Sequence, residues 1–485
     1  MFIKEKFCKT KIICTLGPTC DNEEILRCLI KEGLDGARFN FAHGTQQEHK
    51  ERIERFRKIE KEFGLKLPCI LDTKGPSIKL GDFAEPVILK EGQKFTLTIK
   101  DVRGDINQCT VSHKDIVKDL KPGNSILIDD GLVELKAENI TETDVICTVK
   151  NTGKIDSHKG VNLPGIKTTL PSLTGKDISD IKFGVENCFD FIAASFIRTK
   201  EDCLNIKKYL TQFNGKHVKL IAKIENQEGL DNFDEILKEV DGIEIARGDL
   251  GVEIPVERIP IVQKKIIKKC CQVGKFVITA TQLLESMIVN PRPTRAEVTD
   301  ISNSIIDGTS AIRLGGETAS GKHPVQALQY AHNIALETEK NLNLTELSHS
   351  MKDFKKVDIT NPEVYKKVID YSACVTANIL QAAGIICVTS DGTNPLILSE
   401  YRPKSPIFAI TTHEIVARQL SLYWNVRPAF VESYDNPQDL VQKGIEKFKE
   451  NKFLIPGDTV VICGANVDDK KGIQASMVSV VMKVK

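Results

Sequence analysis

Strand-length apolar runs alternate with helical patterns along most of this chain. The first three runs cover residues 11–15, 36–41 and 67–72. Residues 21–33, between the first two runs, have the amphipathic spacing of a helix, with Asp21 as the expected N-cap and Gly33 as the expected end. Alternating strands and helices predict parallel strands joined by crossover helices.

From about residue 77 to residue 162 the pattern changes to short segments in which apolar and polar residues alternate. This period of two predicts an all-β insertion. The strand and helix alternation then resumes, and a capping-box pattern at Thr294 and Glu297 predicts one of the helix starts. The strand candidates after the insertion are residues 189–196, 218–225, 242–247, 276–281 and 310–314. Three strands before the insertion and five after it predict a TIM (β/α)8 barrel.

A charged stretch, residues 337–358, predicts the link to a third domain. There we expect a helix at residues 371–383 and strands at residues 385–389, 406–410, 428–431, 459–463 and 478–484. This pattern predicts an open α/β sheet. The expected domains are a barrel in two parts (1–75 and 166–345), an all-β cap (76–165) and a C-terminal α/β domain (346–485).

Composition and charge narrow the classes of function. The 485 residues are 41% hydrophobic and 27% charged, and their net charge is +1, so no overall field directs the chain to nucleic acid or to a membrane. No apolar run approaches the roughly 20 residues of a membrane-spanning helix, and the first residues lack the apolar stretch of a secretory signal. The 14 cysteines, most of them inside apolar segments, are expected to be reduced thiols of a cytoplasmic protein.

Polar residues collect where the predicted barrel strands end. In barrels of this kind, catalytic groups come from the carboxyl ends of the strands. Those ends carry Arg38, Asn40, Asp72, Thr73, Lys223, Glu225, Arg247, Asp249, Thr281 and Glu317. Any one of these side chains is more often a structural partner than a catalytic group. Charged residues at the ends of five separate strands nevertheless predict a ligand site.

Lys223 and Glu225 form the sharpest local pattern. Residues two apart on a strand share a face, which here is the barrel interior. A simple salt bridge would explain the pair. With Asp249 from the next strand, however, two carboxylates converge and suit Mg²⁺, which keeps an incomplete protein shell. Gly248 and Gly251 around Asp249 would let backbone N–H groups approach an anion, although a plain strand-to-helix turn explains them as well.

Long sequence blocks contain these positions. They are Thr10–Pro18, Ala37–Gly44, Leu71–Pro76, Lys159–Gly165, Ala194–Arg198, Lys223–Asn226, Ala246–Glu253, Ala280–Met287, Pro291–Glu297 and Gly316–Ala319. Through these blocks the chain resembles the pyruvate kinase family from about Lys11 to Val484. The family has a barrel, a β cap after the third strand and an α/β C-terminal domain, which agrees with the three-part organisation predicted above.

The resemblance implies the last step of glycolysis, in which the phosphoryl group of phosphoenolpyruvate moves to ADP and gives pyruvate and ATP. It assigns Mg²⁺ (or Mn²⁺) to Glu225 and Asp249, and it makes Lys223 the stabiliser of the transition state. The implied substrate contacts are Arg38, Lys223, Gly248, Asp249 and Thr281, with Thr281 near the enolate carbon that is protonated. The implied nucleotide contacts are Asn40, Phe41, Ala42, His43, Lys79 and Lys159, and Asp130 could join them when the cap closes. The family also implies a homotetramer.

The chain departs from the family at a monovalent-cation site. Asn40, Asp72 and Thr73 match the K⁺ ligands, but Ala42 replaces a serine and Ser77 replaces the glutamate of K⁺-requiring members. We therefore expect weak K⁺ dependence or none. Two further departures affect the chemistry of the site. Lys79 stands where an arginine is usual, so the paired N–H groups with which a guanidinium binds phosphate are missing. Gly315 removes a hydroxyl near the catalytic centre.

The C-terminal domain departs more. The loop at residues 389–394 resembles the family's effector phosphate loop, but Asn394 replaces a hydroxyl residue and Asp391 would repel a phosphate. The loop at residues 466–472 lacks the pattern of members regulated by fructose 1,6-bisphosphate. A different sugar phosphate, a nucleotide and no effector at all remain open.

Two rival functions remain. Another enolate-forming barrel enzyme, such as an aldolase or carboxylase, would share the metal carboxylates but would not need the cap, Lys79 or Lys159. A degenerate paralogue that senses phosphoenolpyruvate or acts as a scaffold is the second rival. The presence of Arg38, Lys223, Glu225, Asp249 and Thr281 argues against it. Turnover with ADP, phosphoenolpyruvate and Mg²⁺ separates all three.

Overall fold

The computed structural model describes residues 8–342, 362–466 and 476–485. Eight parallel strands close into a barrel in the order β1-β17-β16-β15-β14-β13-β3-β2. They are β1 (Lys11–Thr15), β2 (Gly36–Asn40), β3 (Cys69–Asp72), β13 (Phe191–Ala194), β14 (Lys219–Ile224), β15 (Gly242–Ala246), β16 (Phe276–Ala280) and β17 (Ala311–Leu314). The predicted TIM barrel is confirmed, with three strands before the insertion and five after it.

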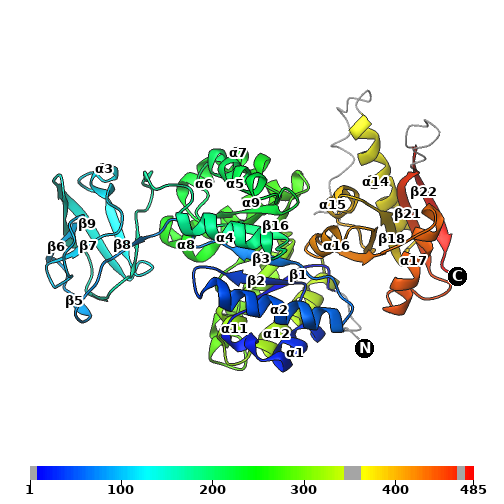
Figure 1. Ribbon diagram of the computed structural model, residues 1–485, viewed down its shortest axis with the longest axis horizontal. Helices are drawn as coiled ribbons and strands as arrows, with labels where there is room; N and C mark the ends of the chain where they lie inside the picture. Colours follow the sequence, from blue (N-terminus) through cyan, green and yellow to red (C-terminus); the bar gives the residue numbers. More distant parts are fainter. Residues whose placement is uncertain (1–7, 343–361, 467–475) are drawn as a thin grey trace.

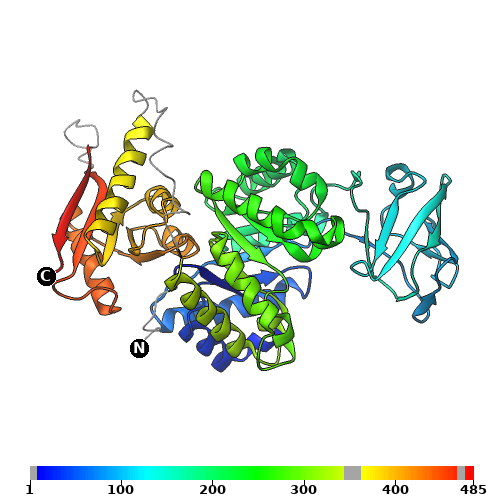
Figure 2. The same cartoon turned by 180° about the vertical axis from the view of Figure 1, so that it is seen from behind.

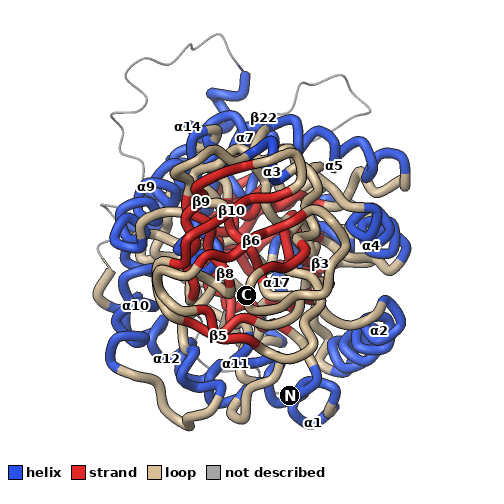
Figure 3. Tube along the Cα trace, turned by 90° about the vertical axis from the view of Figure 1, so that its left-hand side faces the viewer, coloured by secondary structure: helices blue, strands red, loops and turns tan. Residues whose placement is uncertain are grey.

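Helices surround the barrel strands (Figure 3). The longer ones are α1 (Glu23–Lys31), α2 (Gln46–Glu62), α4 (Gly175–Glu186), α5 (Lys200–Gln212), α7 (Phe233–Glu239), α8 (Arg247–Glu253), α9 (Ile259–Gln272), α10 (Arg295–Ile306) and α12 (Pro324–Lys340). Shorter turns are η1 (Pro18–Asp21), α6 (Gln227–Asp231), η2 (Val256–Arg258), η3 (Glu285–Ile288) and α11 (Gly316–Ala319). Helix α10 begins with the predicted capping box of Thr294 and Glu297, which satisfies backbone N–H groups of its first turn.

The predicted N-cap of the first helix is wrong by one residue. Asn22, not Asp21, accepts the backbone N–H groups of Glu24 and Ile25 at 2.8 and 3.4 Å. Asp21 ends the preceding turn η1, and its carboxylate is bound by Arg52 and Arg55, both at 2.9 Å. The helix stops where expected, since Gly33 follows it with a φ of 98° that favours glycine.

The inserted cap has its own sheets and its own core. A seven-stranded sheet has the order β4-β12-β8-β9-β10-β6-β7, and β11 pairs with β5. The strands are β4 (Ile78–Lys79), β5 (Val87–Leu89), β6 (Lys94–Thr98), β7 (Gln108–Thr110), β8 (Ser125–Ile128), β9 (Val133–Ile140), β10 (Asp144–Val149), β11 (Gly153–Ile155) and β12 (Gly160–Asn162). One helical turn, α3 (Ile116–Asp119), interrupts the otherwise β structure. Figures 1 and 2 show the cap and the C-terminal domain on opposite sides of the barrel.

The C-terminal domain is the predicted α/β sheet, with the order β20-β19-β18-β21-β22. Its elements are α14 (Pro362–Ile379), β18 (Gly384–Val388), α15 (Thr393–Glu400), β19 (Ile407–Thr411), α16 (Glu414–Leu420), β20 (Val426–Phe430), α17 (Pro437–Glu450), β21 (Thr459–Asn466) and β22 (Ser476–Lys483). Its first helix begins at Pro362, earlier than predicted. The start of the predicted link, residues 337–340, belongs to helix α12. The rest of that link from residue 343 and nearly all of the predicted loop 466–472 lie outside the described residues.

The interior of the barrel changes from apolar to charged along the strands. At the amino ends, Ile13, Ile70, Ala193, Ile221 and Ala311 are buried in one cluster with residues of the C-terminal domain. Two residues further along, the same interior face carries Thr15, Asp72, Ser195, Lys223 and Arg313, all buried. Apolar side chains therefore fill the barrel interior at the end that faces the C-terminal domain, and polar side chains occupy the interior at the end that faces the cap.

Candidate active site

A carboxylate lies between two cations at the carboxyl end of the barrel. The Oδ2 atom of Asp72, at the end of β3, is 2.6 Å from Nε of Arg38 on β2. Its Oδ1 atom is 3.1 Å from Nζ of Lys223 on β14. Burial raises the pKa of Asp72, but Arg38 and then Lys223 outweigh this effect and hold it well below its usual range. The carboxylate is therefore ionised, and it fixes the distance between the two cations.

Lys223 also contacts Glu225, as the strand pattern predicts. Lys223 Nζ is 3.0 Å from Glu225 Oε1, and both side chains are buried. Burial lowers the pKa of Lys223, but Asp72 and Glu225 outweigh this and leave it above the ordinary lysine value. Burial raises the pKa of Glu225 to about 7; Lys223 opposes this shift and Asp249 adds to it. The ammonium thus stays charged inside the barrel, where a positive charge acts strongly on a nearby anion.

Asp249 and Gly248 lie on helix α8, which follows β15. A Cβ atom at Gly248 would lie 2.7 Å from Thr281 Cγ2, so these two predicted substrate contacts are neighbours. Arg247 holds this junction, since it donates to the carbonyl of Thr281 at 2.6 Å and pairs with Asp300 at 2.7 Å. The predicted contacts Gly248 and Thr281, which follow β15 and β16, are therefore adjacent, and the hydrogen bonds of Arg247 fix their relative position.

A second buried ion pair, which was not predicted from the sequence, lies inside the barrel. Arg313 on β17 donates to Glu244 on β15 at 2.8 and 3.1 Å. Glu317, predicted to be one of the polar residues at the strand ends, instead accepts the backbone N–H groups of Leu284 and Gly315 at 3.1 and 2.6 Å. A charged residue in the middle of each apolar strand was the available signal for Glu244 and Arg313, because such a residue needs a buried partner.

The donors at the site fit a hard divalent cation. Among residues 8–342, 362–466 and 476–485, no group of three or more His, Cys, Asp or Glu is arranged to hold a metal. Glu225 and Asp249 are a smaller set, but their charges interact, and they supply only oxygen ligands. Mg²⁺ is commonly held by one or two carboxylates while water and substrate oxygens complete its shell. A cation at this pair would also relieve the repulsion between the two carboxylates.

Asn40 ends β2, and the loop that follows carries the other predicted nucleotide contacts Phe41, Ala42 and His43. Two contacts fix the backbone of this loop. Lys176 Nζ lies 2.9 Å from the carbonyl oxygen of Phe41, and His49 Nε2 lies 2.9 Å from the carbonyl oxygen of His43. The Phe41 ring is buried and stacks on the His49 ring at 4.0 Å, so the side chain is part of the core. Ala42 and His43 are exposed.

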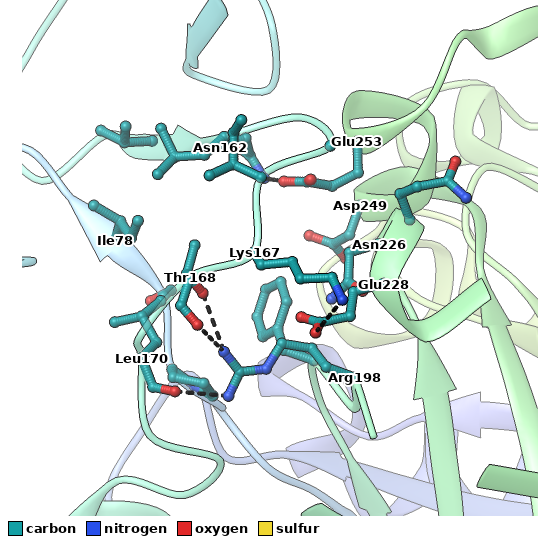
Figure 4. A pocket seen from close by; sticks show the side chains of 18 of the residues that line it. Ile78, Asn162, Lys167, Thr168, Leu170, Arg198, Asn226, Glu228, Asp249 and Glu253 are labelled. Carbon is teal, nitrogen blue, oxygen red and sulfur yellow. Dashed lines mark hydrogen bonds and ion pairs between the residues drawn. The ribbon is translucent and has the colours of Figure 1, made fainter. Parts of the chain in front are cut away.

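A cleft of about 160 Å³ lies between the cap and the barrel (Figure 4). Lys79, Ser77 and Asp130 line it from the cap side, and Asp249 lines it from the barrel. The other predicted cap lysine, Lys159, pairs with Asp129 at 2.9 Å. The lining residues Arg198, Asn226 and Glu228 were not predicted, although Arg198 and Asn226 end two of the sequence blocks given above.

The side chains of Asn162, Arg198 and Lys167 join the cleft walls (Figure 4). Asn162 at the end of β12 donates to Glu253 of α8 at 2.9 Å. Arg198 donates to the Thr168 hydroxyl and the Leu170 carbonyl at 3.0 and 2.7 Å. Lys167 lies 3.9 Å from Glu228. The chain that returns from the cap is therefore fastened to the barrel beside Asp249.

Comparisons with known proteins agree with this arrangement. The model of the pyruvate kinase barrel domain matches residues 7–328, and the model of the pyruvate kinase alpha/beta domain matches residues 367–481. The pyruvate kinases of Clostridium acetobutylicum and Clostridium perfringens are each 45% identical to this chain over 456 residues, which cover 94% of it and 95% of each relative. That of Geobacillus stearothermophilus is 41% identical over 457 residues, 94% of this chain and 77% of the relative. The chain belongs to the pyruvate kinase family and is a phosphotransferase with that family's reaction, the transfer of the phosphoryl group of phosphoenolpyruvate to ADP.

Proposed function

We propose that Lys223 is the group that stabilises the transition state of this transfer. The supporting observation is its buried ammonium, which Asp72 and Glu225 keep charged near Arg38. In the reaction the bond between phosphorus and the enolate oxygen breaks, and a bond forms from phosphorus to a β-phosphate oxygen of ADP. The enolate that leaves takes up a proton at carbon and becomes pyruvate. A fixed positive charge favours both the migrating phosphoryl group and the enolate.

The other proposed substrate contacts surround Lys223. Arg38 binds the phosphoryl group, because a guanidinium matches phosphate oxygens with two parallel N–H groups. Gly248 and Asp249 lie in the first turn of helix α8, and the absence of a side chain at Gly248 leaves room for Thr281. We assign Thr281 to the face of the enolate carbon, where its hydroxyl would position a water molecule that delivers the proton.

We propose that Glu225 and Asp249 hold Mg²⁺, or Mn²⁺ in its place. When bound, the ion supplies positive charge to the phosphoryl and enolate oxygens. Glu225 is ready for this role, because its Oε2 atom accepts the N–H of Phe196 and its orientation is therefore fixed. Binding of Mn²⁺, followed by electron paramagnetic resonance without substrates, tests the assignment. Glu225→Gln should weaken binding at least tenfold, and Glu253→Gln, on the same helix as Asp249, should not. Equal affinity of Glu225→Gln and wild type would contradict it.

The nucleotide is proposed to lie between the cap and the barrel. Residues 40–43, Lys79 and Lys159 supply polar groups and charge, and Asp130 lines the same cleft as Lys79. A closed cap would exclude water, which strengthens each electrostatic contact and limits hydrolysis. Pyruvate formation that depends on ADP is the test of the whole function. Product without ADP would favour another enolate-forming enzyme, and no turnover would favour a scaffold.

We propose that the activity depends on K⁺ only weakly or not at all. The three retained family ligands already have partners: Asn40 Oδ1 accepts the N–H of Ala42 at 3.2 Å, Thr73 Oγ1 accepts that of Ser195 at 3.1 Å, and Asp72 binds two cations. A further cation at Asp72 would be repelled by Arg38 and Lys223. The rate with tetramethylammonium in place of K⁺ should stay within a few-fold, and near-complete loss would contradict the proposal.

We propose a cytoplasmic homotetramer with domain limits at 1–75, 76–165, 166–345 and 346–485. Each of the 14 cysteines is a free thiol, as expected in a reducing compartment. In the described part of the chain, no helix combines the length and apolar composition needed to cross a membrane. Helix α14 and strand β22 expose the apolar side chains Val368, Val375, Ile379, Val480 and Val481. These would be covered by another copy, and light scattering after size-exclusion chromatography measures the assembly.

A further inference from the structure

Both catalytic cations touch a buried hydroxyl in addition to Asp72. Arg38 Nη1 donates to the Thr15 hydroxyl at 3.1 Å, and Lys223 Nζ donates to the Ser195 hydroxyl at 2.7 Å. Thr15 and Ser195 are 3% and 4% exposed, so water does not replace these contacts. Thr15 ends β1, and Ser195 directly follows β13. The two hydroxyls therefore lie on either side of Asp72, one beside each cation.

The direction of each hydrogen bond is determined by a backbone carbonyl. The Thr15 hydroxyl donates to the carbonyl of Leu314 at 2.8 Å, and the Ser195 hydroxyl donates to the carbonyl of Thr73 at 2.7 Å. A carbonyl can only accept, so the single hydroxyl proton is used there and a lone pair faces the cation. Asp72 Oδ1, at 3.3 Å from the Ser195 hydroxyl, is the poorer acceptor. Each hydroxyl is thus locked as an acceptor toward its cation.

The three hydrogens of the Lys223 ammonium have three acceptors, namely Asp72 at 3.1 Å, Ser195 at 2.7 Å and Glu225 at 3.0 Å. Asp72 ends β3 and Ser195 follows the neighbouring strand β13. The two segments are joined again because the N–H of Ser195 donates to the Thr73 hydroxyl at 3.1 Å. Phe196 continues this turn with a φ of 56° and donates its N–H to Glu225. The Ser195–Phe196 turn therefore orients both Lys223 and Glu225.

Gly75 makes room for this turn. A Cβ atom at Gly75 would lie 2.8 Å from both Ser195 Cβ and Phe196 Cδ2, so only glycine lets the two segments approach this closely. Its N–H donates to Asp177 of α4 at 2.9 Å. The segment that contains Gly75 is therefore fixed to α4 and packs directly against the Ser195–Phe196 turn.

We propose that Thr15 and Ser195 are positioning residues, Thr15 for Arg38 and Ser195 for Lys223. The proposal rests on the roles given to those cations under the proposed function. A misplaced stabilising charge loses much of its effect on the transition state, and displacements of about 1 Å cost up to about a hundredfold in rate. Because the two cations have different tasks, loss of the two hydroxyls should affect different kinetic constants.

The test compares Thr15→Val and Ser195→Ala in steady-state assays with phosphoenolpyruvate and ADP. Ser195→Ala should lower kcat by about tenfold to a hundredfold, with KM for phosphoenolpyruvate nearly unchanged. Thr15→Val should raise KM for phosphoenolpyruvate by about tenfold and leave KM for ADP unchanged. Thr15→Ser keeps the hydroxyl and should restore the wild-type KM.

Thr279→Val is the matched control. Thr279 on β16 is equally buried, and its hydroxyl donates to that of Thr309 at 3.0 Å. Within the described residues its hydroxyl forms no hydrogen bond with Arg38 or Lys223. It should lower the unfolding temperature without changing kcat or KM. If Thr15→Val and Ser195→Ala behave like this control, or if both shift kcat and KM alike, the proposal is wrong. If the Lys223→Met variant is as active as wild type, the role proposed for Lys223 is itself wrong. If the Lys223→Met variant is inactive but the Thr15→Val and Ser195→Ala variants have wild-type kinetics, only the positioning role of the two hydroxyls is wrong.

Discussion

The two ends of the barrel both contain buried ion clusters, yet the clusters differ in what surrounds them. At the end that faces the C-terminal domain, Asp190 binds Arg57 at 3.1 Å and Arg418 of α16 at 2.7 Å, and Asp35 binds Arg427 of β20 at 2.9 Å. At the end that faces the cap, Asp72 binds Arg38 and Lys223 beside a cleft. The first cluster joins two domains, and the second lies where ligands are proposed to bind.

The acceptors explain the difference. Asp190 and Asp35 also accept backbone N–H groups, from Cys69 at 2.8 Å and Ile12 at 3.0 Å, so their positions are part of the fold. At the other end, the cations are held by Asp72 and by hydroxyls on separate strands. Similar buried ion pairs thus serve stability at one end and charge placement at the other. Substitutions at the end of the barrel that faces the cap should therefore affect the rate. Substitutions at the end that faces the C-terminal domain, called the closed end below, should affect stability.

The largest expected effect is on the rate of Lys223→Met. Loss of the ammonium should lower kcat by at least about 10²–10³-fold, as for the loss of one preorganised stabilising donor. The fold should survive, because Asp72 keeps its bond to Arg38. Steady-state kinetics and circular dichroism measure the two properties. Lys11→Met is the matched control: the same substitution at the closed end should leave kcat within about twofold. A similar loss of kcat in both variants would remove the distinction between the ends.

Asp190→Ala should have the largest effect on stability. Removing a buried carboxylate leaves Arg57, Arg418 and the N–H of Cys69 without this acceptor, and breaking a buried ion pair costs about 3–5 kcal/mol. Urea unfolding gives the free energy, and kcat below the unfolding transition should equal that of wild type. A variant that unfolds like wild type but turns over slowly would show that the two ends are not separate in function.

Lys11 gives the closed end a pH dependence. Burial lowers its pKa to about 7, and Arg427 adds to this effect while Asp35 opposes it. In the unfolded chain the pKa is near 10.4, so between about pH 7 and 10 the unfolded chain binds more protons at this position. Stability from this group therefore rises as the pH is raised through that window. The free energy of unfolding of wild type minus that of Lys11→Met should increase from pH 7 to pH 9.5, and a constant difference would contradict the expectation.

Much of the fold could be predicted because apolar runs of strand length alternate with amphipathic helical segments, and the period of two along each strand then predicts which side chains share a face. Within a single strand, the change from Ile221 to Lys223, or from Ile70 to Asp72, marks where the barrel interior changes from apolar to charged. The contact between Lys223 and Glu225 follows from the same period. Local pattern alone was therefore enough to bring these side chains to one face.

Features that depend on distant segments could not be predicted. Asp21 and Asn22 can both cap a helix, and the choice depends on Arg52 and Arg55 of α2, which bind Asp21. The pairing of Glu244 with Arg313 depends on barrel closure, which brings β15 and β17 to opposite sides of β16. Hydroxyl roles at Thr15 and Ser195 depend on carbonyls of other strands, so residue type alone does not reveal them.

The smallest expected effect comes from the exposed edge of the same closed end. Glu414 contacts Lys66 at 2.7 Å and Arg418 at 3.2 Å, so it belongs to the interface that contains Asp190, but its side chain is 48% exposed. Water screens the pair and solvates Glu414 and Lys66 when it is broken. Glu414→Gln should therefore lower the free energy of unfolding by only about 0.2–1 kcal/mol, and added salt should reduce the difference from wild type. A loss as large as that of Asp190→Ala would mean that the whole network, rather than the burial of single carboxylates, holds the C-terminal domain to the barrel.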